Sequence, residues 1–194
     1  MTIRGPASRS PSRTGGRDSV DRGLSAWLDE LADVNSGIEA ARQRLRRLAR
    51  QLDRSLAEVA KAHGMSVGDW EALSVLRRSG PPYELSPTAL ARELEITTGT
   101  MSLRLERLSH AALIVRTASP TDGRSHAVRL TETGHERWRT ATAERIHRER
   151  QLVGGPLTTS ELEQLNRLLR KLMLSVEDAL GPAPRHEPAP DPAD

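Results

Sequence analysis

Hydrophobic side chains recur every three or four positions along most of the chain, which is the spacing of one face of a helix. This spacing predicts long amphipathic helices at 18–34, 38–63, 132–153 and 159–180. Shorter apolar stripes predict three more helices, at 67–78, 87–94 and 98–112. Breaks such as Gly80-Pro81-Pro82 separate these segments. The chain is therefore expected to be mainly α-helical.

Helical spacing is lost between residues 113 and 130. Residues 113–117 form a run rich in β-branched side chains, and residues 126–130 alternate as a half-buried strand does. The segment 119–123 between them consists of turn-forming residues. We expect a two-stranded hairpin with a charged tip, and a short third strand at 83–85 that completes a small sheet.

Ser and Thr residues stand where five of the helices should begin. A hydroxyl just before a helix accepts a hydrogen bond from a free N–H of the first turn. The expected caps are Ser66, Ser86, Thr97, Thr131 and Thr158. Thr158 and Glu161 also match the capping box, in which each side chain satisfies the other residue's backbone N–H.

The helices at 87–94 and 98–112, followed by the hairpin, have the layout of a winged helix-turn-helix that binds double-stranded DNA. In the second helix the apolar residues share one stripe, and the opposite face carries small and polar groups that fit a major groove. The DNA contacts expected on this helix are Thr98, Thr100, Ser102, Leu103 and Arg107. Arg104 lies at the flank of the apolar stripe, so we expect it to face the protein.

The net charge of the 194-residue chain is only +3, so the location of the basic residues matters more than their number. Five arginines fall between Arg104 and Arg129, against the two acids Glu106 and Asp122. This local bias supports a DNA-facing surface. The absence of cysteine excludes disulfides, thiol catalysis and zinc–thiolate sites.

No other chemistry is favoured by the sequence. His135-Glu136 resembles the start of a zinc-protease motif, but Arg139 stands where the second histidine would be. The six histidines are scattered, and there is no Gly-rich phosphate loop or Gly-x-Ser-x-Gly elbow. We therefore expect no catalytic residue, no metal and no cofactor. No apolar run is long enough for a membrane span and no signal-peptide core is found, so a cytoplasmic location is expected.

The apolar stripes exceed what one small domain can cover, and pairing with a second copy would bury them. We expect one winged helix domain at 18–180, with its DNA-binding part at 66–131 and its dimerisation helices at 38–63 and 132–180. A homodimer also matches a palindromic operator, since two recognition helices then meet successive major grooves. Residues 1–17 are expected to be a disordered basic arm and residues 181–194 a disordered Pro-rich tail.

One ordered set of short motifs resembles the MarR family of transcription regulators between Leu24 and Leu180. The matching residues are Leu90-Ala91, Leu94, Thr98-Gly99-Thr100-Met101-Ser102, Arg107-Leu108, Leu113-Ile114-x-Arg116, Asp122-Gly123-Arg124 and Leu130-Thr131-x-x-Gly134. One departure is Ala112, where the family usually has glycine. The resemblance implies a homodimeric regulator whose wing tip, Arg124 and Ser125, contacts DNA and is shaped by Asp122 and Gly123.

The resemblance narrows to the urate-responsive, PecS-like branch of that family. This branch has an additional N-terminal helix with a Trp and the run Arg-Ser-x-Pro-Pro, which is present here from Arg78 to Pro82. The residues implied for the ligand are Trp27, Glu71, Ser79 and Arg104, with Glu71 in place of the usual Asp. A planar guanidinium, a hydroxyl and a stacking indole suit a small anionic aromatic effector such as urate.

Two alternatives stay open at this point. The first is a MarR-type regulator that answers a different phenolic ligand, or no ligand. The second, from another class, is a helical protein–protein interaction module that does not bind DNA. The leading hypothesis is a ligand-released repressor.

Overall fold

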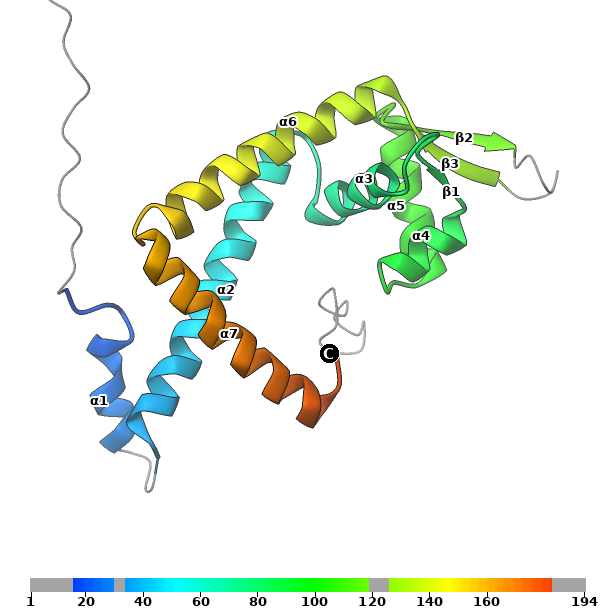
Figure 1. Cartoon of the computed structure of the whole chain (residues 1–194). Helices are drawn as coiled ribbons and strands as arrows, with labels where there is room; N and C mark the ends of the chain where they lie inside the picture. The colour runs from blue at the N-terminus through cyan, green and yellow to red at the C-terminus, as the bar shows by residue number, and fades with distance from the viewer. Residues whose placement is uncertain (1–15, 30–33, 119–125, 183–194) are drawn as a thin grey trace, which may run out of the picture. The chain divides into compact units, whose positions relative to one another are not determined.

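The computed structural model describes residues 16–29, 34–118 and 126–182 (Figure 1). Its elements, in chain order, are α1 (Asp21–Asp29), α2 (Ser36–Ala62), α3 (Val67–Arg78), β1 (Glu84–Leu85), α4 (Pro87–Glu93), α5 (Thr98–His110), β2 (Ile114–Ala118), β3 (His126–Leu130), α6 (Glu132–Glu149), the π-helix η1 (Arg150–Gly154) and α7 (Thr159–Leu180). The expected fold class, mainly α with a small β-wing, is confirmed. None of the described helices is long and apolar enough to cross a membrane.

All five expected caps are confirmed. In each case the side-chain oxygen accepts a hydrogen bond from the backbone N–H three residues later. The capping box at Thr158 and Glu161 is present, and a second one joins Ser66 to Asp69. Short-range hydrogen bonding therefore fixes where α3, α4, α5, α6 and α7 begin.

The chain divides into two compact units, Met1–Asp53 and Arg54–Asp194, and the second contains the main core. In that unit α3 is central, because it contacts α4, α5, α6 and β3. Leu73 and Leu76 of α3 are fully buried, and Val59 and Ala60 from the end of α2 join the same cluster. Two indole N–H groups tie α3 to α6: Trp70 Nε1 donates to Thr142 Oγ1 at 3.0 Å and Trp138 Nε1 to Ser74 Oγ at 2.8 Å.

The sheet has the strand order β1-β3-β2, and both pairings are antiparallel. The register pairs Ile114 with Leu130 and Glu84 with Arg129. Residues 119–125 between β2 and β3 lie outside the described part of the chain, and so do the predicted wing-tip residues Asp122, Gly123, Arg124 and Ser125. Most of the predicted arm (1–17) and tail (181–194) lie outside it as well.

The first unit contains α1 and most of α2. Asp18 caps α1, since its Oδ1 accepts from the backbone N–H groups of Val20 at 2.7 Å and Asp21 at 2.9 Å. Arg44 of α2 donates from Nε to the other Asp18 oxygen at 2.8 Å. These hydrogen bonds, with that from Arg44 the largest influence, hold the pKa of Asp18 well below its usual range. Polar contacts thus attach the additional N-terminal helix to α2.

Several boundaries differ from the sequence-based expectation. α1 begins at Asp21 rather than residue 18, because Asp18 serves as the cap. The β1 strand excludes Tyr83, whose φ of 61° is incompatible with an extended strand. α6 ends at Glu149 and continues as a π-helix, where Gly154 and Gly155 weaken the helical preference of the last turn.

α5 also ends earlier than expected, at His110, and its end explains the role of Ala112. Ala112 has a φ of 55°, in the left-handed region that normally requires glycine. The N–H of Leu113 returns to the Leu108 carbonyl at 2.9 Å, as in a Schellman cap. The turn therefore keeps the geometry that the family resemblance assigns to glycine, with a strained alanine at its key position.

Candidate nucleic-acid interface and effector site

α5 is held against the core by one stripe, which leaves its opposite face open. Met101, Leu105 and Leu108 are each at most 2% exposed. The turn from α4 brings the chain round through Glu95, with a φ of 53°, and Ile96, whose N–H donates to the Ala91 carbonyl at 3.0 Å. This turn orients α5 so that its polar face lies on the surface of the second unit.

Four of the predicted DNA contacts lie on that open face. Thr98, Thr100, Ser102 and Leu103 are exposed, and Leu103 reaches 62%. The Ser102 hydroxyl donates to the Thr98 carbonyl at 2.9 Å, so its oxygen remains available as an acceptor. An exposed leucine on a polar helix face suits a thymine methyl group in a major groove.

A surface hollow of about 480 Å³ extends this face toward β2. Its lining includes residues that the sequence analysis did not assign to DNA: Glu106, Ser109, His110 and Arg116. Helical periodicity could have found the first three, since they share the exposed side of α5. Arg116 comes from β2, and only the folded chain brings it beside the helix.

Arg107, predicted as a DNA contact, has a partner within the protein. Its Nη2 donates to Asp69 Oδ1 at 3.1 Å, although more than half of the Arg107 side chain is exposed. Asp69 is 7% exposed and belongs to the first turn of α3. The open face of α5 is therefore linked to the N-terminus of α3 by a charge-assisted hydrogen bond.

Arg104 lies one turn earlier on the flank of α5 and is turned into the protein. Its guanidinium is half-buried, and its Nε and Nη1 atoms are buried without a hydrogen-bond partner. Burial lowers the pKa of Arg104, while the negative charges of Glu71 and Asp69 raise it and Arg107 lowers it further. The cation stands over Gly68, beside the positive end of α3. A charged group with unsatisfied donors in such a place favours an anion.

The four residues implied for the effector are not all close together. Arg104 and Glu71 interact electrostatically across α5 and α3. Ser79 caps the far end of α3, roughly 16 Å along the helix from Gly68 at the usual rise per residue, and its hydroxyl donates to the Leu76 carbonyl. One small anion cannot touch both ends of α3 in this arrangement.

Trp27 belongs to the first unit, where its side chain is about half exposed. It hydrogen-bonds to Glu39 of α2, a weaker influence on that carboxylate than Arg42 and Gln43. Together these donors lower the pKa of Glu39 from its ordinary 4.5 to about 2. The indole thus lies beside the start of α2, and its pairing with Arg104 stays a prediction.

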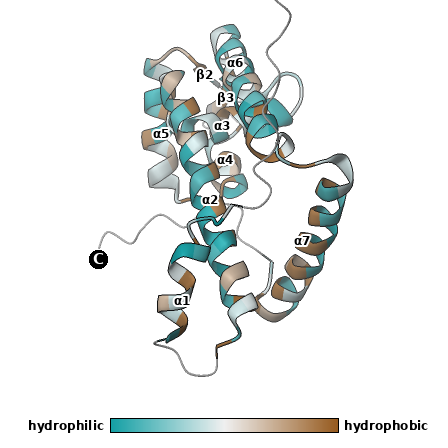
Figure 2. Ribbon diagram, turned by 90° about the vertical axis from the view of Figure 1, so that its left-hand side faces the viewer, coloured by the Kyte–Doolittle hydropathy of each residue, from teal (hydrophilic) through white to brown (hydrophobic). Residues whose placement is uncertain are grey.

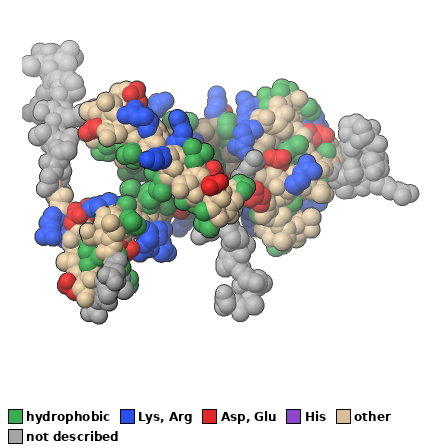
Figure 3. All heavy atoms as spheres, turned by 60° about the horizontal axis from the view of Figure 1, so that its bottom comes forward, with side chains coloured by type: hydrophobic (Ala, Val, Ile, Leu, Met, Phe, Trp, Pro, Cys, Tyr) green, Lys and Arg blue, Asp and Glu red, His purple; other side chains and the backbone are tan. Residues whose placement is uncertain are grey.

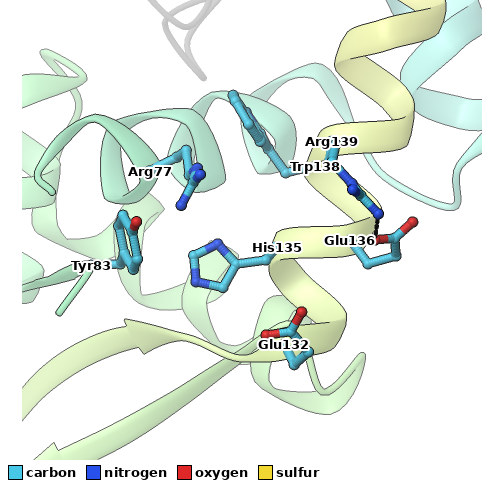
Figure 4. A pocket seen from close by; sticks show the side chains of 7 residues that line it. All are labelled: Arg77, Tyr83, Glu132, His135, Glu136, Trp138 and Arg139. Atoms are coloured by element: carbon cyan, nitrogen blue, oxygen red, sulfur yellow. Dashed lines mark hydrogen bonds and ion pairs between the residues drawn. The ribbon is translucent and has the colours of Figure 1, made fainter. Parts of the chain in front are cut away.

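A second hollow, of about 320 Å³, lies between α3, Tyr83 and the start of α6 (Figure 4). Arg77 Cζ stands 4.6 Å from the Tyr83 ring centroid and 5.8 Å from that of Trp138, and Tyr83 meets His135 edge-on at 4.6 Å. Glu132 and the ion pair of Glu136 with Arg139 form its rim. The sequence does not predict this cluster, because Arg77 and Tyr83 are far along the chain from the residues of α6. The stacking of Arg77 on Tyr83 and Trp138 packs α3 against α6, and this structural role accounts for the cluster without a ligand.

No group of three or more His, Cys, Asp or Glu side chains suited to a metal occurs among the described residues. One histidine, His63, pairs with a carboxylate: its Nε2 lies 2.9 Å from Glu144 Oε2. Arg137 donates to the His63 carbonyl at 2.8 Å, so these side chains join the end of α2 to α6.

The sequence is similar to known regulators of transcription. A sequence model of the MarR family matches residues 63–125, from the turn after α2 through α5 and β2. The chain is 29% identical over 149 residues to the HTH-type transcriptional regulator PecS of Dickeya dadantii, which covers 77% of this chain and 89% of that protein.

Solved structures show the same fold at lower identity. YusO of Bacillus subtilis aligns with a TM-score of 0.64 and 21% identity, over 74% of this chain and 99% of YusO. Sco3205 of Streptomyces coelicolor, a MarR family regulator solved in complex with DNA, aligns with a TM-score of 0.61 and 24% identity, over 78% of this chain and 93% of its own. MarR of E. coli gives a TM-score of 0.59 at 21% identity, over 74% and 99% of the two chains.

Proposed function

The chain belongs to the MarR family of DNA-binding transcriptional regulators, and on this premise we propose that it is a homodimeric repressor that leaves a palindromic operator when a small planar anion binds at Arg104. Three parts of the proposal rest on different surfaces. They are the open face of α5, the apolar stripe of α7 and the half-buried guanidinium of Arg104.

The DNA surface is proposed to be the open face of α5 together with the hollow beside β2. Thr98, Thr100 and Ser102 offer hydroxyls, and Leu103 offers an apolar tip. The wing-tip residues Arg124 and Ser125, shaped by Asp122 and Gly123, are proposed to contact phosphates beyond this helix. Helix and wing together then read a groove and its flanking backbone.

The homodimer is proposed from the apolar side chains that the single chain leaves open. In α7 these recur with helical spacing (Figure 2), and the exposed side chains on one stripe include Leu165, Leu169, Leu172, Met173 and Val176. Hydrophobic side chains also reach the surface elsewhere among basic ones (Figure 3). In the first unit α2 exposes Ile38, Leu45 and Leu48. A continuous apolar stripe of this length indicates a protein interface, and a second copy provides a matching stripe.

The dimer is tested with two leucines of α7 that differ in their helical position. Leu169 lies on the apolar stripe, whereas Leu174 is exposed off it. We expect Leu169→Glu to produce monomers in light scattering, because a carboxylate would be buried in the interface, and Leu174→Glu to leave dimers. A dimeric, folded Leu169→Glu protein would place the interface elsewhere.

The effector part depends on one observation, the two buried and unsatisfied N–H groups of Arg104 on the recognition helix. An anion that accepts from them satisfies both donors and neutralises a desolvated cation. It also lies close to Glu71, which it repels. Binding therefore changes the charge environment of the helix that reads DNA, and that is the differential interaction a switch requires.

The planar fork of a guanidinium favours a planar anion, and the resemblance to the PecS-like branch suggests urate. Trp27 is proposed to provide a stacking surface, and Ser79 is the implied residue that the geometry supports least. A coupling of about 1–3 kcal/mol between effector and DNA would weaken operator binding by roughly 5–150-fold.

The test is a gel shift with operator DNA and increasing urate, xanthine or salicylate, on the wild type and on Arg104→Ala. We expect urate to release the wild type and to act much more weakly on Arg104→Ala. Release by salicylate alone would favour the alternative phenolic effector. Equal release of both proteins by urate would move the site away from Arg104. Failure of the wild type to bind any duplex would favour the protein-interaction alternative.

A further inference from the structure

Asp69 contacts both the start of α3 and Arg107 of α5. Its Oδ2 accepts the backbone N–H of Ser66 at 3.0 Å, which completes a capping box. Its Oδ1 receives Arg107 Nη2 at 3.1 Å. Asp69 also acts electrostatically on Arg104. Asp69 is itself buried and caps the start of α3, so it cannot move far and its partners must move instead.

The charges around Asp69 are balanced. Arg104 and Arg107 come from α5, and Asp69 and Glu71 come from α3. Arg107 is the member with freedom to leave, because 58% of its side chain is exposed whereas only 10% of that of Asp69 is. Its position on α5 lies between the flank that carries Arg104 and the open face that carries Leu103. One guanidinium thus stands between a buried carboxylate and the surface proposed for DNA.

We propose that Asp69 is a positioning residue that holds Arg107 back from DNA, so that operator binding requires Arg107 to exchange this carboxylate for a phosphate. The inference rests on the DNA surface proposed above for α5. The carboxylate and the phosphate compete for the same donors, and the stronger the hold of Asp69, the smaller the net gain from the phosphate contact. Asp69 therefore limits the affinity of the regulator for DNA.

The same exchange gives the effector a second route of action. An anion at Arg104 adds negative charge near Arg107 and strengthens its retention on the α3 side. By linkage, the anion then binds better when Arg107 is on Asp69, and DNA binds better when it is not. In this scheme the position of Arg107 couples effector binding to DNA binding, and the strength of its ion pair with Asp69 sets the size of that coupling.

The first experiment needs no effector. Asp69→Asn keeps an oxygen for the Ser66 N–H but loses the charge, and Asp69→Gln is a second uncharged residue of the kind that a capping box accepts at this position. We expect both variants to bind operator DNA about twofold to tenfold more tightly than the wild type, since a partly exposed ion pair no longer competes. The wild-type complex makes the same phosphate contact once Arg107 has exchanged, so the salt dependence of binding should change little.

The matched control is Arg107→Gln, alone and combined with Asp69→Asn. Removing Arg107 should abolish the gain, so that the double variant binds like Arg107→Gln. Circular dichroism and thermal unfolding identify any variant that has lost its fold, and the remaining one of the two Asp69 variants then decides the result. Weaker DNA binding by a folded Asp69 variant would overturn the proposal, because Asp69 would then be orienting Arg107 toward DNA. An affinity equal to that of the wild type in a folded Asp69 variant would overturn it as well.

A second experiment repeats the titrations with urate. If Asp69 sets the coupling, urate should weaken DNA binding by a smaller factor in Asp69→Asn than in the wild type, and an equal factor would remove Asp69 from the effector response. If urate has no effect on the wild type, the proposed effector fails, while the comparison without effector still decides the role of Asp69.

Discussion

Gly68 lies directly against the guanidinium of Arg104: a Cβ added at Gly68 would come within 2.5 Å of Arg104 Cζ. The first turn of α3 can therefore accept the cation of α5 only because residue 68 has no side chain. The sequence of neither helix by itself predicts this contact. It fixes where the charge proposed to bind the effector stands.

We predict that Gly68→Ala moves the Arg104 guanidinium without unfolding the protein. Alanine suits the first turn of a helix, and the clash is with the end of a flexible side chain. We expect about a tenfold weaker response to urate in operator-binding titrations, similar in direction to Arg104→Ala. Gly99→Ala, which meets nothing closer than 3.9 Å, is the control for an added methyl group. A Gly68→Ala protein with the full urate response would show that this contact is not needed.

Gly134→Ala should destabilise the second unit strongly. A Cβ at Gly134 would overlap the Leu113 carbonyl oxygen and come within 3.0 Å of its carbon, and these backbone atoms at the junction of β2 and α6 cannot easily retreat. Overpacking of this kind costs about 1–3 kcal/mol or more. Thermal unfolding measures the loss, and Gly23→Ala, with open space around it, should show none. Equal melting temperatures would contradict the close approach seen here.

Ala112→Gly should stabilise the protein. Ala112 has a φ of 55°, and a left-handed alanine costs about 1–2 kcal/mol, part of which is offset by the greater freedom of glycine in the unfolded chain. We expect a gain of up to about 1 kcal/mol in the free energy of unfolding by urea. Ala111→Gly is the matched control, since Ala111 has an ordinary φ of −78° and should only lose stability. A loss at both positions would contradict the strain at Ala112.

The stability contribution of Glu39 should depend on pH in a defined direction. Its pKa is lowered to about 2 by hydrogen bonds, chiefly from Arg42, so the charged form is favoured in the folded first unit. This contribution is complete above pH 4.5 and is lost as the pH falls toward 2. The difference in melting temperature between wild type and Glu39→Gln should thus be constant near neutral pH and vanish toward pH 2. A difference that does not change over this range would exclude the carboxylate as its source.

The sequence by itself determined the elements of this protein and the kind of surface they form. Ser86, Thr97 and Thr131 each fix a helix start by a bond to an N–H three residues away, so their effect needs no distant partner. The stripe of Met101, Leu105 and Leu108 decides which face of α5 is buried, and so leaves Thr100 and Leu103 exposed. These signals depend on neighbouring residues or on helical periodicity, so they can be read from the amino-acid sequence alone.

Only the tertiary structure decided which charged groups meet. Asp69 and Arg107 are 38 residues apart, and nothing in either segment indicates that one carboxylate both caps α3 and binds the recognition helix. The family pattern grouped Ser79 with Arg104, whereas the fold puts Ser79 at the other end of α3 from the guanidinium. The physical reason is that an ion pair or a close contact depends on how two helices pack and on the absence of a side chain at Gly68, and packing joins residues that the sequence separates.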